Sequence, residues 1–136
     1  MLAIITAIHL AALSQIESGD RDRIIGRAGE VSRWQIMPEV ARRQLKLCPE
    51  LRTQPYTLTD LIWNADAARI IVASEWESRA QAFQTQHLRA PTVPELYLLW
   101  HRPARVLAPK PAELERARRF ENIVRKLTAA QPKAKP

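Results

Sequence analysis

Apolar side chains recur at intervals of three and four residues along most of this chain, which is the spacing of one face of an α-helix. No segment keeps the two-residue alternation of a half-buried strand, and no Asn-Gly or Asp-Gly pair of the kind that closes a hairpin occurs. Ten prolines stand mostly at the joints between the periodic segments. The pattern therefore predicts an all-α fold in which helices are joined by proline-marked turns.

Five periodic segments are predicted to be helices, at residues 2–17, 38–48, 58–87, 95–101 and 110–130. Gly19 is the expected C-cap of the first helix, because glycine readily takes the left-handed conformation found there. Pro38 and Pro111 suit the first turns of the second and last helices. A polar loop should follow the first helix through residue 32, and a proline-containing connection should cover residues 49–57. The tail at residues 131–136 is expected to be disordered.

Three threonines stand where helix N-caps are expected. Thr57 and Thr59 precede the long third helix, in which a break near residues 64–66 is compatible with the pattern. Thr92 and Glu95 have the Thr-x-x-Glu form of a capping box, in which each side chain bonds the backbone of the other residue. The short helix that this box opens is expected to stop at Pro103.

The composition indicates the number of domains and the net charge of the protein. The 136 residues are 46% hydrophobic, which suits one domain with a single core. Lys and Arg number 21 against 14 Asp and Glu, so the net charge is +7. A partner of opposite charge follows: nucleic acid, an acidic membrane or an acidic wall polymer.

Few residues are suited to metal or redox chemistry. Cys48 is the only cysteine, which excludes an internal disulfide. The histidines, His9, His87 and His101, fall at no ligand spacing, so we expect neither a metal nor another cofactor. The first dozen residues are apolar but lack the pattern of a secretory signal, and they are too few to span a bilayer. We therefore expect no stable membrane insertion.

Glu17 interrupts the apolar face of the first predicted helix. It lies four residues after Leu13 and seven after Leu10, so its carboxyl projects from the stripe that should face the core. Burial and the negative end of the helix dipole would both favour the protonated carboxyl. A carboxyl that keeps its proton is suited to general acid catalysis. The alternative is a polar residue at the rim that begins the loop.

The residues around Glu17 resemble the goose-type lysozymes and soluble lytic transglycosylases of the lysozyme-like superfamily. The matching segments are "IESGD" at 16–20, "IGRAGE" at 25–30, "SRWQIMP" at 32–38 and "LLWHRPARV" at 98–106. The family has Glu-Ser-Gly, then a segment like Gly-Leu-Met-Gln-Ile-Met-Pro, and later Ala-Tyr-Asn-Ala-Gly-Pro. The resemblance implies a lysozyme-like helical domain at residues 1–108, with a C-terminal helical extension at 109–130.

The resemblance also implies a reaction. Glu17 would protonate the glycosidic oxygen between N-acetylmuramic acid and N-acetylglucosamine and then act as the base. In a lytic transglycosylase the substrate's acetamido group assists and the muramyl 6-hydroxyl attacks, so a second carboxylate is not needed. The partner would be the glycan strands of peptidoglycan, and the location would be periplasmic or extracellular, although no signal peptide is visible in this chain.

Six further residues are candidates for substrate binding by this resemblance: Ser18, Trp34, Gln35, Tyr97, Trp100 and His101. Several of them could instead have a purely structural role, and some of them differ from the residues of the family. Ser18 could cap the helix, Gln35 could hold loop backbone, and Trp34 could be a core aromatic. Trp100 and His101 replace the family's Tyr-Asn pair, and His101 could be a helix cap. Tyr97, one turn before Trp100, is the residue able to replace the missing tyrosine hydroxyl.

Three other functions stay open at this point. A hydrolytic, inverting lysozyme would place Asp20, Asp22 or Glu30 about 6.5–9.5 Å from Glu17. A non-catalytic peptidoglycan-binding or scaffold domain would keep only the fold. A nucleic-acid module would use the basic residues of the last helix, but Arg116, Arg118, Arg119, Arg125 and Lys126 alternate there with Glu113, Glu115 and Glu121. Mixed charges indicate a solvated helix face, so we expect no nucleic-acid partner. The oligomeric state stays undetermined.

Overall fold

The structure is a computed structural model that describes residues 2–21, 25–52, 56–58 and 60–132. It is mostly helical, and its described part contains no β-sheet, which confirms the all-α prediction. The candidate cap Thr59, the loop residue Asp22 and the tail residues 133–136 lie outside the described residues.

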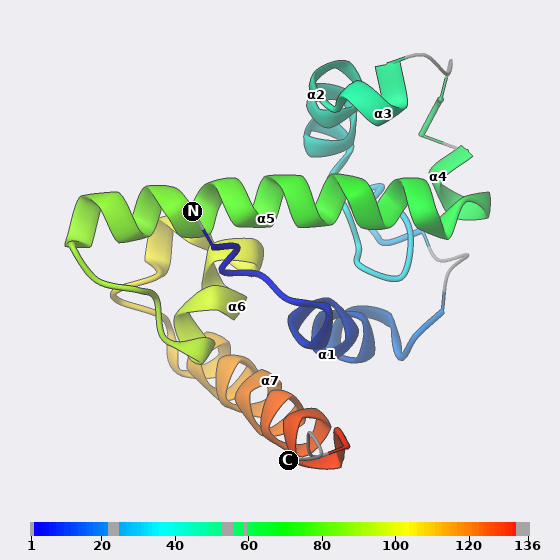
Figure 1. Cartoon of the computed structure of the whole chain (residues 1–136). Helices are drawn as coiled ribbons and strands as arrows, with labels where there is room; N and C mark the ends of the chain where they lie inside the picture. Colours follow the sequence, from blue (N-terminus) through cyan, green and yellow to red (C-terminus); the bar gives the residue numbers. More distant parts are fainter. Residues whose placement is uncertain (1, 22–24, 53–55, 59, 133–136) are drawn as a thin grey trace.

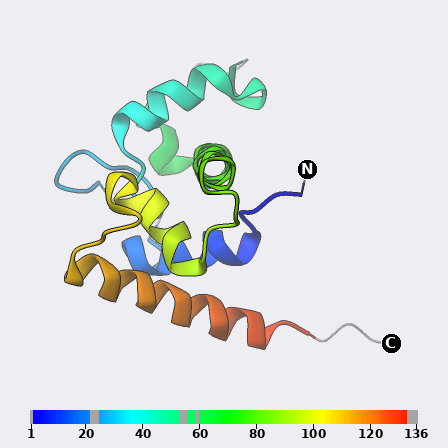
Figure 2. The ribbon, with the colours of Figure 1, turned by 90° about the vertical axis from the view of Figure 1, so that its left-hand side faces the viewer.

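The long helix α5 runs through the middle of the molecule (Figures 1 and 2). On one side of it lie α2 and α3, and on the other lie α1 and α6, with α7 forming an outer layer against α1 and α6. The elements are α1 (Ala7–Ser18), α2 (Pro38–Leu47), α3 (Pro49–Arg52), α4 (Asp60–Trp63), α5 (Ala65–His87), α6 (Val93–His101), the 3-10 helix η1 (Pro103–Arg105) and α7 (Pro111–Ala130).

Helix α1 begins five residues later than the hydrophobic pattern predicts. Thr6 and His9 form a capping box: each side chain bonds the backbone N–H of the other residue. The preceding N–H groups of Ile4 and Ile5 donate instead to Glu77 Oε1, at 2.7 and 3.0 Å. The apolar opening is therefore tied to α5 and does not extend the helix. At the other end Gly19 has φ 61°, as expected of a left-handed C-cap.

The long segment predicted at 58–87 is divided into two helices. Thr57 Oγ1 accepts a hydrogen bond from the N–H of Asp60 and opens α4, as its capping role predicts. Asn64 then leaves the helical conformation, and its side chain accepts from the N–H of Ala67 to open α5. The break falls where the pattern allowed it because a second cap restarts the helix there.

Two short features were not expected from the pattern. Four residues of the predicted proline-containing connection form α3 (Pro49–Arg52). The loop after α1 carries isolated antiparallel bridges that join Val31 to Ile25 and to Ile36. Leu47, the last residue of α2, is 60% exposed.

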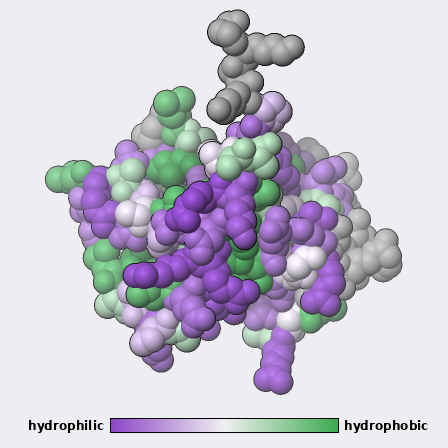
Figure 3. Space-filling model, turned by 90° about the horizontal axis from the view of Figure 1, so that it is seen from below, coloured by the Kyte–Doolittle hydropathy of each residue, from purple (hydrophilic) through white to green (hydrophobic). Residues whose placement is uncertain are grey.

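The predicted apolar face of the last helix packs into the common core. Phe120 is fully buried, with ring centroids 5.9 Å from Trp76 of α5 and 5.6 Å from Tyr97 of α6. Its neighbour Ala117 is also fully buried. The capping box of Thr92 and Glu95 opens α6 as predicted. Helix α7 is thus packed against the elements that carry the candidate site, and the outer face of the molecule on that side is mostly hydrophilic (Figure 3).

We expect Phe120→Ala to lower the free energy of unfolding by about 3–5 kcal/mol, because it leaves a cavity among packed aromatic rings. Urea denaturation followed by circular dichroism measures this loss. Leu107→Ala is the control, since Leu107 is 59% exposed and its truncation should cost less than about 0.5 kcal/mol. Equal losses in the two variants would contradict the role given to α7 in the core.

Candidate active site

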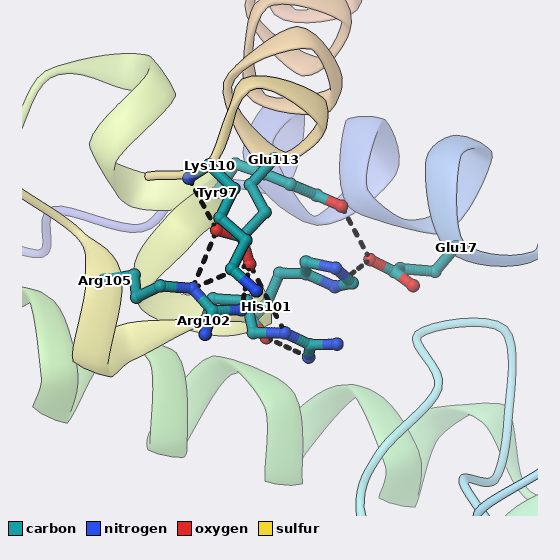
Figure 4. Close-up of polar contacts among 7 residues, drawn as sticks. All are labelled: Glu17, Tyr97, His101, Arg102, Arg105, Lys110 and Glu113. Atoms are coloured by element: carbon teal, nitrogen blue, oxygen red, sulfur yellow. Dashed lines mark hydrogen bonds and ion pairs between the residues drawn. The ribbon is translucent and has the colours of Figure 1, made fainter. Parts of the chain in front are cut away.

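Glu17 lies in the last turn of α1, on the face that the sequence pattern assigned to it. Leu13, one turn earlier, is fully buried, and the Glu17 side chain is only 10% exposed. The carboxylate faces α6 and α7 (Figure 4). Gly19 then ends the helix, so the chain turns away directly behind the carboxylate. Glu17 is a sheltered residue, which disagrees with the alternative of a rim residue in a solvated loop.

Tyr97 of α6 reaches Glu17 from the core. Its hydroxyl donates a hydrogen bond to Glu17 Oε1 at 3.4 Å, while its side chain is fully buried (Figure 4). Burial and the nearby negative charge of Glu17 raise the pKa of the Tyr97 hydroxyl well above its usual range. The hydroxyl therefore keeps its proton and remains a donor at every working pH. The family resemblance raised this possibility: Tyr97 could supply the hydroxyl of the family tyrosine that this chain lacks.

Two basic side chains flank the same carboxylate. His101 Nδ1 lies 3.6 Å from Glu17 Oε1, and the imidazole stacks on Tyr97 with ring centroids 5.3 Å apart (Figure 4). Arg116 Nη2 of α7 lies 3.9 Å from Glu17 Oε2. The two carboxylate oxygens thus face different neighbours. His101 therefore lies beside the candidate acid, whereas its position at a helix end had suggested only a capping role.

A pocket of about 280 Å³ opens in front of Glu17. It is built by α1, the loop before α2, and the helices α2, α5, α6 and α7. Its lining residues are Glu17, Glu30, Gln35, Met37, Val40, Arg79, Trp100, His101, Arg102 and Arg116. The pocket therefore combines two carboxylates with several basic groups and one large aromatic ring.

The loop wall of the pocket is shaped by a tight turn. Val31 and Ile36 exchange two backbone hydrogen bonds of 2.9 and 2.8 Å, and within this turn Gln35 takes the left-handed φ of 52°. Gln35 Nε2 donates to the carbonyl of Ser32, so this side chain both holds loop backbone and lines the pocket. Glu30 Oε2 accepts from the N–H of Ala28. The loop thus holds an amide and a carboxylate at the pocket wall.

Trp100 lines the pocket next to His101. Its indole N–H donates to the carbonyl of Trp34 at 3.3 Å, and the Arg79 guanidinium lies 5.3 Å from the centre of its ring. The ring is partly exposed. An aromatic ring held in this way offers a flat apolar surface at the pocket, of the kind on which sugar rings pack.

Three of the six predicted substrate-binding residues do not line this pocket: Tyr97, which reaches Glu17 from the core, and Ser18 and Trp34. Ser18 is buried; its hydroxyl donates to the carbonyl of Ser14 and accepts from the N–H of Arg21, so it caps the end of α1. Trp34 is 5% exposed, and its indole N–H donates to the carbonyl of Leu10 at 2.8 Å. Trp34 packs against α1 because its apolar ring and single donor are both satisfied there. The structural alternatives hold for Ser18 and Trp34.

Of the possible second carboxylates, Glu30 is the one that the structure places in the pocket. Asp20 turns back to α1, where it accepts a hydrogen bond from the Ser14 hydroxyl at 2.5 Å. Asp22 lies outside the described residues. Among the residues that the structure describes, no group of three or more His, Cys, Asp and Glu side chains lies together as a metal site would require.

The sequence pattern missed the basic residues of the pocket. Arg116 was assigned to a solvated basic face, but it lies four residues before Phe120 and one before Ala117, both of which are fully buried. A charged residue at that helical spacing is the same signal that identified Glu17 in α1. Arg79 carries the same signal, since it lies four residues before Phe83 and one before Ala80, which are both buried. Arg102 follows the end of α6 and carries no such signal.

Two glycine substitutions should distinguish the effect of displacing pocket side chains from the effect of straining the backbone. A Cβ at Gly26 would lie 2.0 Å from Glu30 Oε2 and 2.5 Å from Gln35 Oε1. Gly26→Ala should therefore displace both side chains, and because they are flexible the free energy of unfolding should fall by less than about 1 kcal/mol. The shift of the Gln35 side-chain amide resonances in NMR spectra reports the displacement.

Gly19→Ala is the matched substitution. A Cβ at Gly19 would meet no atom within 4 Å, but φ is +61°, so left-handed strain should cost about 1 kcal/mol. The Gln35 amide resonances should stay in place. Unchanged resonances in Gly26→Ala would contradict the close contact at the pocket wall.

Comparisons of the chain with protein-family models, with curated proteins and with solved structures find no match. The chemistry of the site must therefore be argued from its own residues.

Proposed function

We propose that this protein is a peptidoglycan-cleaving lytic transglycosylase in which Glu17 is the general acid and base. The observation that carries the proposal is the Glu17 carboxyl itself: it is 10% exposed, lines a pocket and accepts a hydrogen bond from the buried Tyr97 hydroxyl. A sheltered carboxyl with a fixed orientation is the minimum that glycosidic bond cleavage requires. The motifs around it, Glu-Ser-Gly and Gln-Ile-Met-Pro, resemble those of the lytic transglycosylases.

In the proposed reaction the Glu17 carboxyl donates its proton to the oxygen that links N-acetylmuramic acid to N-acetylglucosamine. The bond from the muramyl C1 to that oxygen breaks, and N-acetylglucosamine leaves as an alcohol. The muramyl acetamido group stabilises the cationic C1. The Glu17 carboxylate then takes the proton of the muramyl 6-hydroxyl as this oxygen bonds to C1. A 1,6-anhydro sugar forms, and Glu17 ends with the proton it began with.

The neighbours of Glu17 have distinct parts in this proposal. The Tyr97 hydroxyl holds Oε1, which leaves the carboxyl little freedom to turn away from the bond. Gln35 and His101 offer polar groups to the sugar, and Trp100 offers a partly exposed ring. The departure from the family's Tyr-Asn pair is compatible with activity, because Tyr97 supplies a hydroxyl to the acid from one helical turn earlier.

Hydrolysis is a second candidate, which the position of Glu30 favours. Glu30 lines the same pocket as Glu17, and in an inverting lysozyme it would be the base that activates a water molecule. A non-catalytic peptidoglycan-binding domain is the third, since the polar, basic and aromatic groups of the same pocket can bind a glycan without cleaving it. The products formed from peptidoglycan distinguish all three.

The partner and the location follow from the substrate. A chain with a net charge of +7 is attracted to wall polymers, which carry acidic groups. Peptidoglycan as substrate implies a periplasmic or extracellular site of action. No helix in the described part of the chain has both the length and the apolar character needed to cross a membrane.

Wild-type protein incubated with purified peptidoglycan should release 1,6-anhydromuropeptides, identified by mass spectrometry. Glu17→Gln should lower their rate of formation by at least about a hundredfold, because it removes the general acid. Glu39→Gln is the matched control, since Glu39 is exposed and lies outside the pocket. Reducing-end products that disappear in Glu30→Gln would indicate the lysozyme instead, and no products from the wild type would refute enzymatic activity on peptidoglycan.

Tyr97→Phe should lower kcat by about tenfold, because one hydrogen bond to the acid is lost while the ring stays in place. Its thermal midpoint should change little. Tyr56→Phe is the matched control: the Tyr56 hydroxyl also makes one hydrogen bond of 3.4 Å, to Asn64 Nδ2, and Tyr56 does not line the pocket. A similar fall in kcat in both variants would argue against a positioning role for Tyr97.

A further inference from the structure

The guanidinium of Arg116 does not make all the hydrogen bonds that its N–H groups allow. Arg116 Nη2 lies 3.9 Å from Glu17 Oε2, which is beyond hydrogen-bonding distance. Its Nε is buried without a hydrogen-bond partner among the described residues. A buried donor without an acceptor is costly. The Arg116 side chain is still 41% exposed at the pocket, so acceptor atoms of a ligand can approach its outer edge.

The other two arginines of the pocket are held more closely by other groups. Arg79 Nε pairs with Glu75 Oε2 at 3.2 Å, and Arg79 Nη1 donates to the carbonyls of Leu99 and Trp100. Arg102 Nε lies 3.5 Å from Glu113 Oε2, and its Nη1 donates to the carbonyl of His101. Of the three pocket arginines, Arg116 is thus the one whose nearest carboxylate oxygen lies farthest away.

Resting on the proposed function, we propose that Arg116 binds a carboxylate carried by the muramyl residue whose bond is cleaved. A guanidinium presents parallel N–H donors that fit the two oxygens of a carboxylate. N-acetylmuramic acid differs from N-acetylglucosamine by its lactyl group, which ends in a carboxylate in peptide-free glycan and bears an acidic stem peptide otherwise. Arg116 would therefore make the pocket selective for muramyl glycan over neutral glycan.

The surroundings favour a carboxylate over a phosphate. Glu30 lines the same pocket, and its negative charge repels a dianion more strongly than a monoanion. Arg116 lies beside Glu17 Oε2, whereas Tyr97 and His101 lie beside Oε1. A carboxylate bound to Arg116 is thus adjacent to the proposed acid, as expected for a substituent of the sugar at the cleaved bond.

Calorimetric binding tests this subsite without requiring catalysis. The protein carries Glu17→Gln so that no ligand is cleaved. The ligands are three tetrasaccharides of alternating N-acetylglucosamine and N-acetylmuramic acid: one with free lactyl carboxylates, one with those groups converted to primary amides, and one bearing the dipeptide L-Ala-D-Glu. We expect at least one of the two acidic ligands to bind about tenfold more tightly than the amide, and whichever does identifies the source of the carboxylate.

Three substitutions in the Glu17→Gln background test whether Arg116 causes the preference for acidic ligands over the amide. Arg116→Gln should abolish it, and Arg116→Lys should keep part of it, because the charge remains but the paired donors are lost. Arg118→Gln is the matched control: Arg118 is exposed on the same helix and does not line the pocket, so the full preference should remain.

The outcomes separate this proposal from the proposed function. Equal affinity for acid and amide, no binding of either acidic ligand, or a preference that survives Arg116→Gln would overturn the subsite, even if the wild type releases anhydromuropeptides. A carboxylate preference that depends on Arg116 would support the subsite even if the wild type cleaves nothing. In that case the pocket is a muramyl-binding site and not an active site.

Discussion

The arrangement of the site depends on the burial of aromatic rings where α1, α5, α6 and α7 meet. Phe120 contacts Trp76 and Tyr97, and the His9 ring of α1 lies within 6.5 Å of its centroid. These rings are large, so their burial supplies a substantial part of the stability of a small domain. The same packing fixes the backbone of α6 and α7 relative to α1. Tyr97 and Arg116 can reach Glu17 only because this core holds the three helices together.

The same packing sets the polar and charged groups that surround the Glu17 carboxylate. The packing that shelters the Glu17 carboxylate also places Tyr97, His101 and Arg116 around its two oxygens. The buried Tyr97 hydroxyl orients the carboxyl at Oε1, while the Arg116 guanidinium lies beside Oε2. An anionic group of the substrate that bound Arg116 would compete with Glu17 for that guanidinium. Substrate recognition and the surroundings of Glu17 would then be linked through one side chain.

Much of this arrangement was predictable from local patterns. The Leu10, Leu13 and Glu17 spacing placed the carboxyl against the core, and glycine and threonine caps marked several helix ends, because caps act within one turn. Predictions failed where a distant group decided the outcome. Glu77 takes the N–H groups that would have extended α1, and the carbonyl of Leu10 takes the indole N–H of Trp34. Neither partner is visible from local spacing.

The sequence by itself therefore determined the helical class, the caps at Gly19 and Thr92 and the inward direction of Glu17, since each depends on residues within a few positions of one another. Tertiary structure decided which side chains meet that carboxyl. Tyr97 and Arg116 lie 80 and 99 residues beyond Glu17, and the register of α6 and α7 against α1 brings them to it. Separations of this size carry no periodic signal, because the contacts arise only when whole helices pack face to face.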